Sequence, residues 1–181
     1  KRMVEKEIFE YYDVEVKRNM IDHNFNFKEF NLTDVQKTAF EEIKIKFSQN
    51  KNVLFKGVTS SGKTEIYISL IIELLNSKNQ ILFLVPEIAL TTQLVERLKI
   101  YFPKNLVVYH SGLNINQRAE LWNEIIKNEE PQVIIGARSA VLLPYNKLKL
   151  IIVDEEHEQS YKQYEPSPRY HARDAALLLG N

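Results

Sequence analysis

Two glycines, a lysine and a threonine in residues 57–64 have the spacing of a phosphate-binding loop, Gly-x-x-x-x-Gly-Lys-Thr. Glycine permits the tight backbone and close phosphate approach that such a loop requires, and a helix beginning near Lys63 would turn its positive end toward the phosphates. Lys63 would neutralise the β- and γ-phosphates of a nucleotide, and the Thr64 hydroxyl would hold Mg²⁺. The residues predicted to surround the nucleotide are Gly57, Val58, Thr59, Ser60, Ser61, Gly62, Lys63, Thr64 and Glu65.

A loop rich in glycine and serine could match this spacing without binding a nucleotide. The flanking sequence disfavours that alternative, because residues 53–55 form an apolar run that predicts a strand and an amphipathic segment follows Lys63. Strand, loop and helix in this order are the context in which the motif binds phosphate.

Three carboxylates and a histidine follow the apolar run at residues 148–153: Asp154, Glu155, Glu156 and His157. So much negative charge at the end of a strand is costly unless a cation lies there, and a Mg²⁺ shared with Thr64 would supply it. Asp154 is expected to contact the metal ion or its water, and Glu155 to polarise the attacking water. Lys63, Asp154 and Glu155 are therefore the predicted catalytic residues. The alternative is an ordinary solvated acidic loop after a core strand.

Gln36 has two interpretations. Thr33 and Gln36 fit the Thr-x-x-Gln pattern of a capping box at the start of a helix. A glutamine upstream of a phosphate-binding loop also suits adenine, because its carboxamide can accept from N6 and donate to N7. The residue alone favours the cap, whereas the motifs that follow it favour the adenine contact.

The elements that must position these residues alternate along the chain. Further apolar runs predict strands at residues 80–85, 106–109, 133–135 and 148–153. Helices are predicted at residues 32–47, from residue 63, and at residues 89–100, 115–127 and 175–179, with Leu121, Trp122, Ile125 and Ile126 facing inward in the fourth. This alternation predicts an α/β fold, a parallel sheet with helices on both faces and ligands at the carboxyl ends of its strands.

Composition bounds the class of protein. The 181 residues fit one domain with a substantial core, and the absence of cysteine argues against a disulfide scaffold and cysteine-bound zinc. The apolar runs are too interrupted to span a membrane, so a cytoplasmic protein is expected. Because 24 basic residues balance 24 acidic ones, attraction to nucleic acid would have to come from a local patch. The opening Lys-Arg-Met suggests a piece of a longer protein.

The motifs resemble those of superfamily 2 helicases, and most of all the PriA family of replication-restart helicases. In chain order the resemblance rests on the phosphate-binding loop with Glu65 and on residues 86–91, 110–113, 136–140, 154–157, 160–163 and 169–174. The most specific part is the acidic box, residues 154–157, followed by Tyr-Lys-Gln and Arg-Tyr-His-Ala-Arg-Asp.

This resemblance implies a RecA-like first motor lobe at residues 32–181, preceded at residues 1–31 by a linker or the end of a DNA-binding winged-helix region. It implies an ATP-driven, Mg²⁺-dependent 3′-to-5′ helicase of the bacterial cytoplasm. Its partners would be single-stranded and forked DNA, together with replication-restart and helicase-loading proteins. A second lobe with an arginine finger and a zinc-binding insertion would lie outside this chain.

In this family two regions contact DNA. Segments that grip single-stranded DNA would supply Pro86, Glu87, Thr91, His110, Ser111, Gly112, Arg138 and Ser139. His157 and the aromatic-rich loop that follows it would stack bases, neutralise phosphates and report DNA to the nucleotide site. The loop residues are Tyr161, Lys162, Tyr164, Arg169, Tyr170 and Arg173. Taken singly, the same residues could form turns and caps, pair Arg138 with Glu87 and Arg173 with Asp174, or fold tyrosines back onto the lobe.

Two other functions remain open from the sequence. One is another superfamily 2 translocase, which sequence beyond residue 181 would distinguish. The other is a nucleotide-gated scaffold that does not hydrolyse ATP. The presence together of Lys63, Thr64, Asp154 and Glu155 disfavours the scaffold, which has no need of all four.

Overall fold

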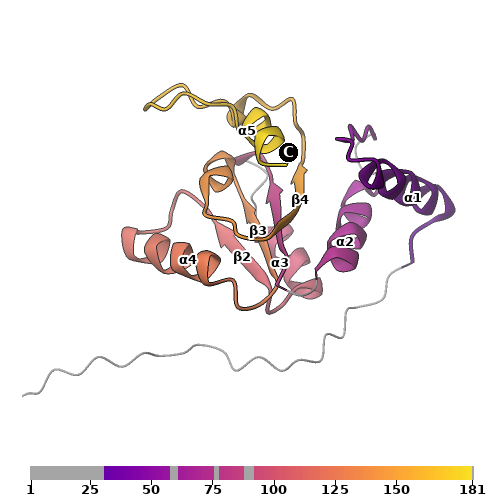
Figure 1. Ribbon diagram of the computed structural model, residues 1–181, viewed down its shortest axis with the longest axis horizontal. Coiled ribbons are helices and arrows are strands. Elements are labelled where there is room, and N and C mark those ends of the chain that lie inside the picture. The colour runs from indigo at the N-terminus through magenta and orange to yellow at the C-terminus, as the bar shows by residue number, and fades with distance from the viewer. Residues whose placement is uncertain (1–30, 58–60, 76–77, 88–91, 181) are drawn as a thin grey trace, which may run out of the picture.

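The computed structural model describes residues 31–57, 61–75, 78–87 and 92–180 (Figure 1). Its elements in chain order are α1 (Asp34–Ser48), α2 (Lys63–Leu74), β1 (Gln80–Leu84), α3 (Thr92–Tyr101), β2 (Leu106–Tyr109), α4 (Ile115–Lys127), β3 (Gln132–Gly136), η2 (Arg138–Leu142), β4 (Leu148–Val153), η3 (Gln159–Tyr161) and α5 (Ala172–Leu179). The two η elements are 3₁₀ turns.

The described strands form one parallel sheet in the order β2-β3-β1-β4. Central strand β1 pairs with β3 and β4, so that Phe83 lies level with Ile135 and Ile152. Parallel strands separated by helices place all their carboxyl ends at one edge of the sheet. The loops that follow β1, β2, β3 and β4 therefore meet there.

Alternating side chains of the strands build two cores, one on each face of the sheet. Ile81 and Phe83 pack on one face with residues of α1, α2 and α3. Leu82 and Leu84 pack on the other with residues of α4, η2 and α5. Figure 1 shows α1 and α2 on the opposite side of β4 and β1 from α4. The α/β fold with helices on both faces is confirmed.

The strand predicted at residues 53–55 is wrong. Residues 51–57 form neither helix nor strand, and the described sheet ends at β4. Val53 and Phe55 still pack against the core, while Leu54 is 65% exposed. The run is apolar because alternate side chains are buried, but a strand also needs a hydrogen-bonded neighbour, which tertiary packing decides.

Two helix predictions need correction. Trp122 and Ile126 were expected inward, but they are 45% and 43% exposed, whereas Ile125 is fully buried. They lie one turn apart on α4, beside the buried stripe. Helix α5 also begins at Ala172, three residues before its predicted start. No described helix is long and apolar enough to cross a membrane.

Some predictions lie outside the described residues. These are the linker at residues 1–31 except for its last residue, the phosphate-loop residues Val58, Thr59 and Ser60, and Thr91.

Candidate functional site

The two glycines of the phosphate-binding loop differ in what requires them: Gly62 is required by its backbone conformation, and both lie close to neighbouring side chains. Gly62 has a φ of 80°, in the left-handed region, and a Cβ there would lie 2.1 Å from Gln36 Nε2. A Cβ on Gly57 would lie 2.7 Å from Ser61 Oγ. Glycine adopts the left-handed conformation of Gly62, the residue before α2 begins at Lys63, without the strain that a Cβ would add.

Lys63 connects the phosphate-binding loop to the acidic box. Its Nζ donates to the Gly57 carbonyl at 3.1 Å and lies 3.4 Å from Glu155 Oε1, although Lys63 and Glu155 are 92 residues apart in sequence. The lysine side chain is 21% exposed, so its charge is held rather than freely solvated. The two motifs therefore share one cavity of about 390 Å³, lined by Gly62, Lys63, Thr64, Glu65, Arg97, Asp154 and Glu155.

Asp154 is held at the end of β4 from two sides. Its N–H donates to the Leu84 carbonyl at 2.9 Å, and its carbonyl accepts from the Tyr161 hydroxyl at 2.6 Å. Its Oδ1 accepts from the Tyr67 hydroxyl at 3.3 Å. Burial, and then the charge of Glu155, raise the pKa of Asp154, while the Tyr67 hydrogen bond and Lys63 oppose that rise. A bound cation would stabilise this carboxylate in its charged form.

Glu155 has a strained backbone and an accessible carboxylate. Its φ is 47°, in a region that residues other than glycine rarely adopt. The turn is closed by the Glu158 N–H, which donates to the Glu155 carbonyl at 2.9 Å. Its side chain is 42% exposed, and His157 Nε2 lies 3.8 Å from its Oε2. The arrangement aims a carboxylate into the cavity at a cost of about 1–3 kcal/mol.

The capping interpretation of Gln36 is confirmed. Gln36 Oε1 accepts from the Thr33 N–H at 2.8 Å, and the Thr33 hydroxyl accepts from the Gln36 N–H at 3.4 Å. Gln36 Nε2 also donates to the Gly62 carbonyl at 3.3 Å, which ties the cap to the phosphate-binding loop. A carboxamide has a second lone pair and a second N–H, so the adenine contact stays a prediction.

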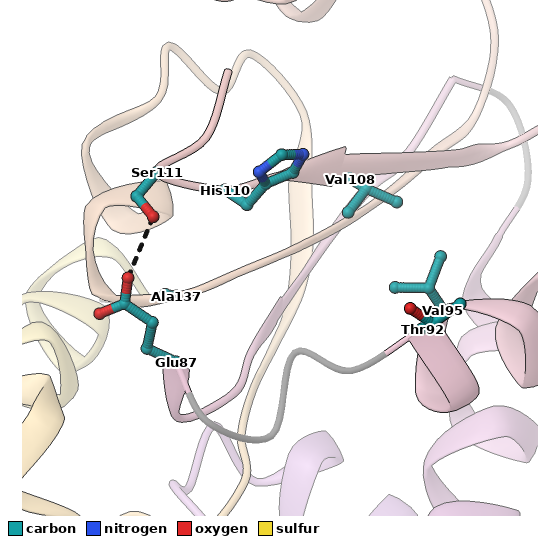
Figure 2. A pocket seen from close by; sticks show the side chains of 7 residues that line it. All are labelled: Glu87, Thr92, Val95, Val108, His110, Ser111 and Ala137. Atoms are coloured by element: carbon teal, nitrogen blue, oxygen red, sulfur yellow. Dashed lines mark hydrogen bonds between the residues drawn. The ribbon is translucent and has the colours of Figure 1, made fainter.

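A second cavity of about 360 Å³ is lined by three predicted DNA-contact residues, Glu87, His110 and Ser111, together with Thr92, Val95, Val108 and Ala137 (Figure 2). The Ser111 hydroxyl donates to Glu87 Oε1 at 3.1 Å, which joins the segments after β1 and β2. Glu87, His110, Ser111 and Gly112 are exposed, and Ser139 is half-buried. Pro86 is buried at the end of the β1 segment, so its predicted DNA contact is wrong for the side chain.

The alternative interpretation paired Arg138 with Glu87, but Arg138 has other partners in the structure. Its Nη1 donates to the carbonyls of Lys162 at 3.0 Å and Ser160 at 3.4 Å. The guanidinium therefore braces η2 against the aromatic-rich loop and has less freedom to contact phosphate.

The aromatic-rich loop divides into a fixed base and an exposed end. Tyr161 is fully buried, so its predicted base stacking is wrong: its ring fills the core, and burial raises the pKa of its hydroxyl. Lys162 and His171 form an antiparallel bridge that closes the loop, and Tyr164 is 64% exposed. Tyr170 is half-buried and its hydroxyl donates to the Arg138 carbonyl at 3.5 Å.

The two arginines of the loop, Arg169 and Arg173, are already paired. Arg173 Nη1 lies 3.1 Å from Glu156 Oε2, and its Nε lies 3.0 Å from Asp174 Oδ1, as the pairing alternative expected. Exposed Arg169 lies 3.9 Å from Glu165. The Arg173–Glu156 pair links α5 directly to the acidic box.

Comparison with known families decides the class of this fold. The family model described as DEAD/DEAH box helicase matches residues 33–178. The chain belongs to the DEAD/DEAH box helicase family. Membership of this family implies nucleotide binding in general, and the fold is the RecA-like lobe that the motifs predicted.

Within this family, the chain is similar to replication restart proteins named PriA. The helicase chain is 45% identical over 148 residues to the replication restart protein PriA of Bacillus subtilis, covering 81% of this chain and 18% of that protein. It is 46% identical over 149 residues to PriA of Haemophilus influenzae, covering 82% and 20%. It is 44% identical over 150 residues to PriA of Helicobacter pylori strain 26695, covering 83% and 23%. The resemblance to the PriA helicase lobe is confirmed, and the chain spans about a fifth of the length of these relatives.

Two residues of this helicase site were missed by sequence reasoning. Tyr67 contacts Asp154, and Arg97 from α3 pairs with Glu65 at the cavity wall. Tyr67 lies one helical turn after Lys63, a spacing that could have suggested it. Arg97 belongs to no motif, and only the packing of α3 brings it to the cavity.

Proposed function

We propose that residues 32–181 form the first motor lobe of an ATP-driven DNA helicase of replication restart, which moves 3′ to 5′ along single-stranded DNA in the bacterial cytoplasm. The observation that carries this proposal is the 3.4 Å approach of Lys63 Nζ to Glu155 Oε1. It brings a phosphate-binding cation and a water-polarising carboxylate to one cavity, as ATP hydrolysis requires. The names of the PriA relatives support the link to replication restart.

Each residue of the cavity has a role in this reaction. When a nucleotide binds, Lys63 exchanges its contact with Glu155 for the β- and γ-phosphates and neutralises their charge. The Glu155 carboxylate is then free to orient and polarise the attacking water. The Gly62–Lys63 turn and the start of α2 point N–H groups toward phosphate oxygens. Tyr67 holds Asp154 in place through its hydroxyl.

The residues present fit Mg²⁺. Asp154 and Thr64 line the same cavity and offer oxygen ligands. No group of three or more histidine, cysteine, aspartate or glutamate side chains able to hold a metal occurs in the described residues. Mg²⁺ commonly binds through one or two carboxylates together with phosphate and water, so this smaller set suffices. When bound, Mg²⁺ would supply positive charge against the negative charge that develops on the phosphates.

Single-stranded DNA would lie over the cavity of Figure 2 and the exposed end of the aromatic-rich loop. Hydroxyl and backbone groups there can bind phosphates without reading sequence, and Tyr164 can stack on a base. Restart and helicase-loading proteins are the partners expected for the full-length protein.

The test measures ATP turnover by the full-length protein with and without single-stranded DNA, and strand separation on duplexes with 3′ or 5′ tails. We expect DNA to stimulate turnover and only 3′-tailed duplexes to be opened. Lys63→Ala, which removes the phosphate-binding charge, should abolish both activities. DNA-independent turnover, or opening of 5′-tailed duplexes alone, would reject the proposal.

A further inference from the structure

An ion pair forms part of the wall of the nucleotide cavity. Glu65 lies in the first turn of α2, directly after Thr64, and Arg97 lies on α3. Arg97 Nη2 donates to Glu65 Oε1, and both residues line the cavity with Lys63 and Asp154. The Glu65 side chain is 30% exposed, so its carboxylate belongs to the cavity wall rather than to open solvent.

The carboxylate lies beside Gln36 at the glycine turn. Glu65 Oε2 and Gln36 Nε2 would lie 3.1 Å and 2.1 Å from a Cβ placed on Gly62. Both side chains therefore crowd the same point above the phosphate-binding loop. Glu65 therefore lines the same cavity as Lys63, which would neutralise phosphates, and lies beside Gln36, whose carboxamide is predicted to contact the base.

A carboxylate in this position opposes phosphate binding unless its charge is balanced. Arg97 supplies the balancing charge and engages only Oε1. Within the described residues, Oε2 has no hydrogen-bond donor, so it is available to a ligand. A nucleotide with its phosphates at Lys63 and its base at Gln36 carries its ribose between them, and ribose hydroxyls are hydrogen-bond donors.

We propose that Glu65, held in place by Arg97, accepts a hydrogen bond from a ribose hydroxyl and makes this site selective for ribonucleotides. The inference rests on the proposed nucleotide function of the cavity. Glu65 is the specificity-determining residue, and Arg97 is a positioning residue that acts through it.

The test compares dissociation constants of the full-length protein for ATP, 2′,3′-dideoxyATP and inorganic tripolyphosphate, which lacks both sugar and base. The wild type should prefer ATP to dideoxyATP by about tenfold, the usual worth of a hydrogen bond to a charged group. Glu65→Ala should bring this ratio close to one without weakening tripolyphosphate. Glu65→Gln, which keeps an acceptor, should give an intermediate ratio.

Arg97→Ala separates position from charge. It should lower the ATP to dideoxyATP ratio and also weaken tripolyphosphate, because Glu65 is then unpaired beside the phosphates. The double variant Glu65→Ala with Arg97→Ala should recover tripolyphosphate affinity but not the ratio. Glu73→Ala is the matched control. Glu73 lies on the same helix and also forms an ion pair, with its Oε1 3.1 Å from Lys44 Nζ, but it does not line the cavity. It should change neither quantity.

Failure of the ribose contact and failure of the proposed nucleotide site give different results. If the wild type binds neither ATP nor tripolyphosphate, or if Lys63→Ala binds them unchanged, the proposed nucleotide site is wrong. If the wild type binds ATP in a Lys63-dependent way but does not discriminate against dideoxyATP, only the ribose contact is wrong. A ratio retained in both Glu65→Ala and Glu65→Gln overturns it equally, and thermal melting of each variant verifies its fold.

Discussion

The two cavities at the carboxyl edge of the sheet are similar in size, about 390 and 360 Å³, yet they differ in how their polar groups are held. In the cavity between the phosphate-binding loop and the acidic box, the proposed nucleotide site, charged groups are paired across separate elements, Lys63 with Glu155 and Arg97 with Glu65. In the cavity of Figure 2, Glu87 is held by Ser111, and much of the remaining lining is valine and alanine.

Under the proposed function, the two cavities would bind polyanions in different ways. A preorganised set of charges concentrates affinity in a few side chains, so single substitutions there have large effects. A surface of hydroxyl and backbone groups spreads affinity over many weak contacts. The nearby cation Arg138 is already engaged with backbone carbonyls, which strengthens the contrast. We therefore expect nucleotide handling to fail with one substitution and DNA binding to weaken gradually.

The largest expected effect comes from separating binding and chemistry inside the nucleotide cavity. In the full-length protein, Lys63→Ala should lose ATP affinity, because a charge is removed from the phosphates. Glu155→Gln should retain ATP but lower turnover by about 10²–10⁴, the usual worth of a general base. Equilibrium ATP binding and single-turnover hydrolysis measure the two quantities. Equal loss of ATP binding in both variants would contradict the assigned roles.

A smaller effect is expected where the aromatic-rich loop and α5 contact the acidic box. Replacing Tyr170 and Arg173 with alanine removes the contact of α5 with Glu156, so basal ATP turnover should persist while its maximal stimulation by DNA falls. Coupling between two sites is typically worth about 5- to 150-fold.

Tyr164→Ala serves as the comparison for that variant, because Tyr164 is exposed at the far end of the same loop. It should require more DNA but reach the wild-type maximum. The measurement is ATPase rate against DNA concentration. If the Tyr170 and Arg173 variant behaves as Tyr164→Ala does, the loop is a binding contact without coupling.

An effect of similar size is expected at Gln36, which serves the cap and touches the phosphate-binding loop. Gln36→Ala should weaken ATP more than GTP, by about 1–3 kcal/mol of discrimination, and should cost about 1 kcal/mol of stability through the cap. Gln117→Ala is the matched control, because Gln117 closes the same kind of capping box on α4. A fall in melting temperature with an unchanged ATP to GTP preference would leave capping as the only role of Gln36.

Local sequence determined the parts of this protein whose physics is local. Thr33 and Gln36 are three residues apart, so their reciprocal cap follows from helix geometry. The glycines, Lys63 and Thr64 lie within eight consecutive residues, so their spacing in the sequence was enough to predict a phosphate site. The continuous apolar runs predicted the buried strands, and their alternation with helices predicted the parallel sheet.

Tertiary structure decided the rest, because it depends on which distant segments pack together. Residues 53–55 are as apolar as a strand, but no described neighbour pairs with them. The motif around Tyr161 predicts a base-stacking residue, yet its ring is buried in the core and its hydroxyl donates to the Asp154 carbonyl. Arg97 lies in no motif and reaches Glu65 because α3 packs on the same face of the sheet as α2. A sequence pattern records which side chains are available, whereas partners, burial and exposure are set by contacts between elements far apart in the chain.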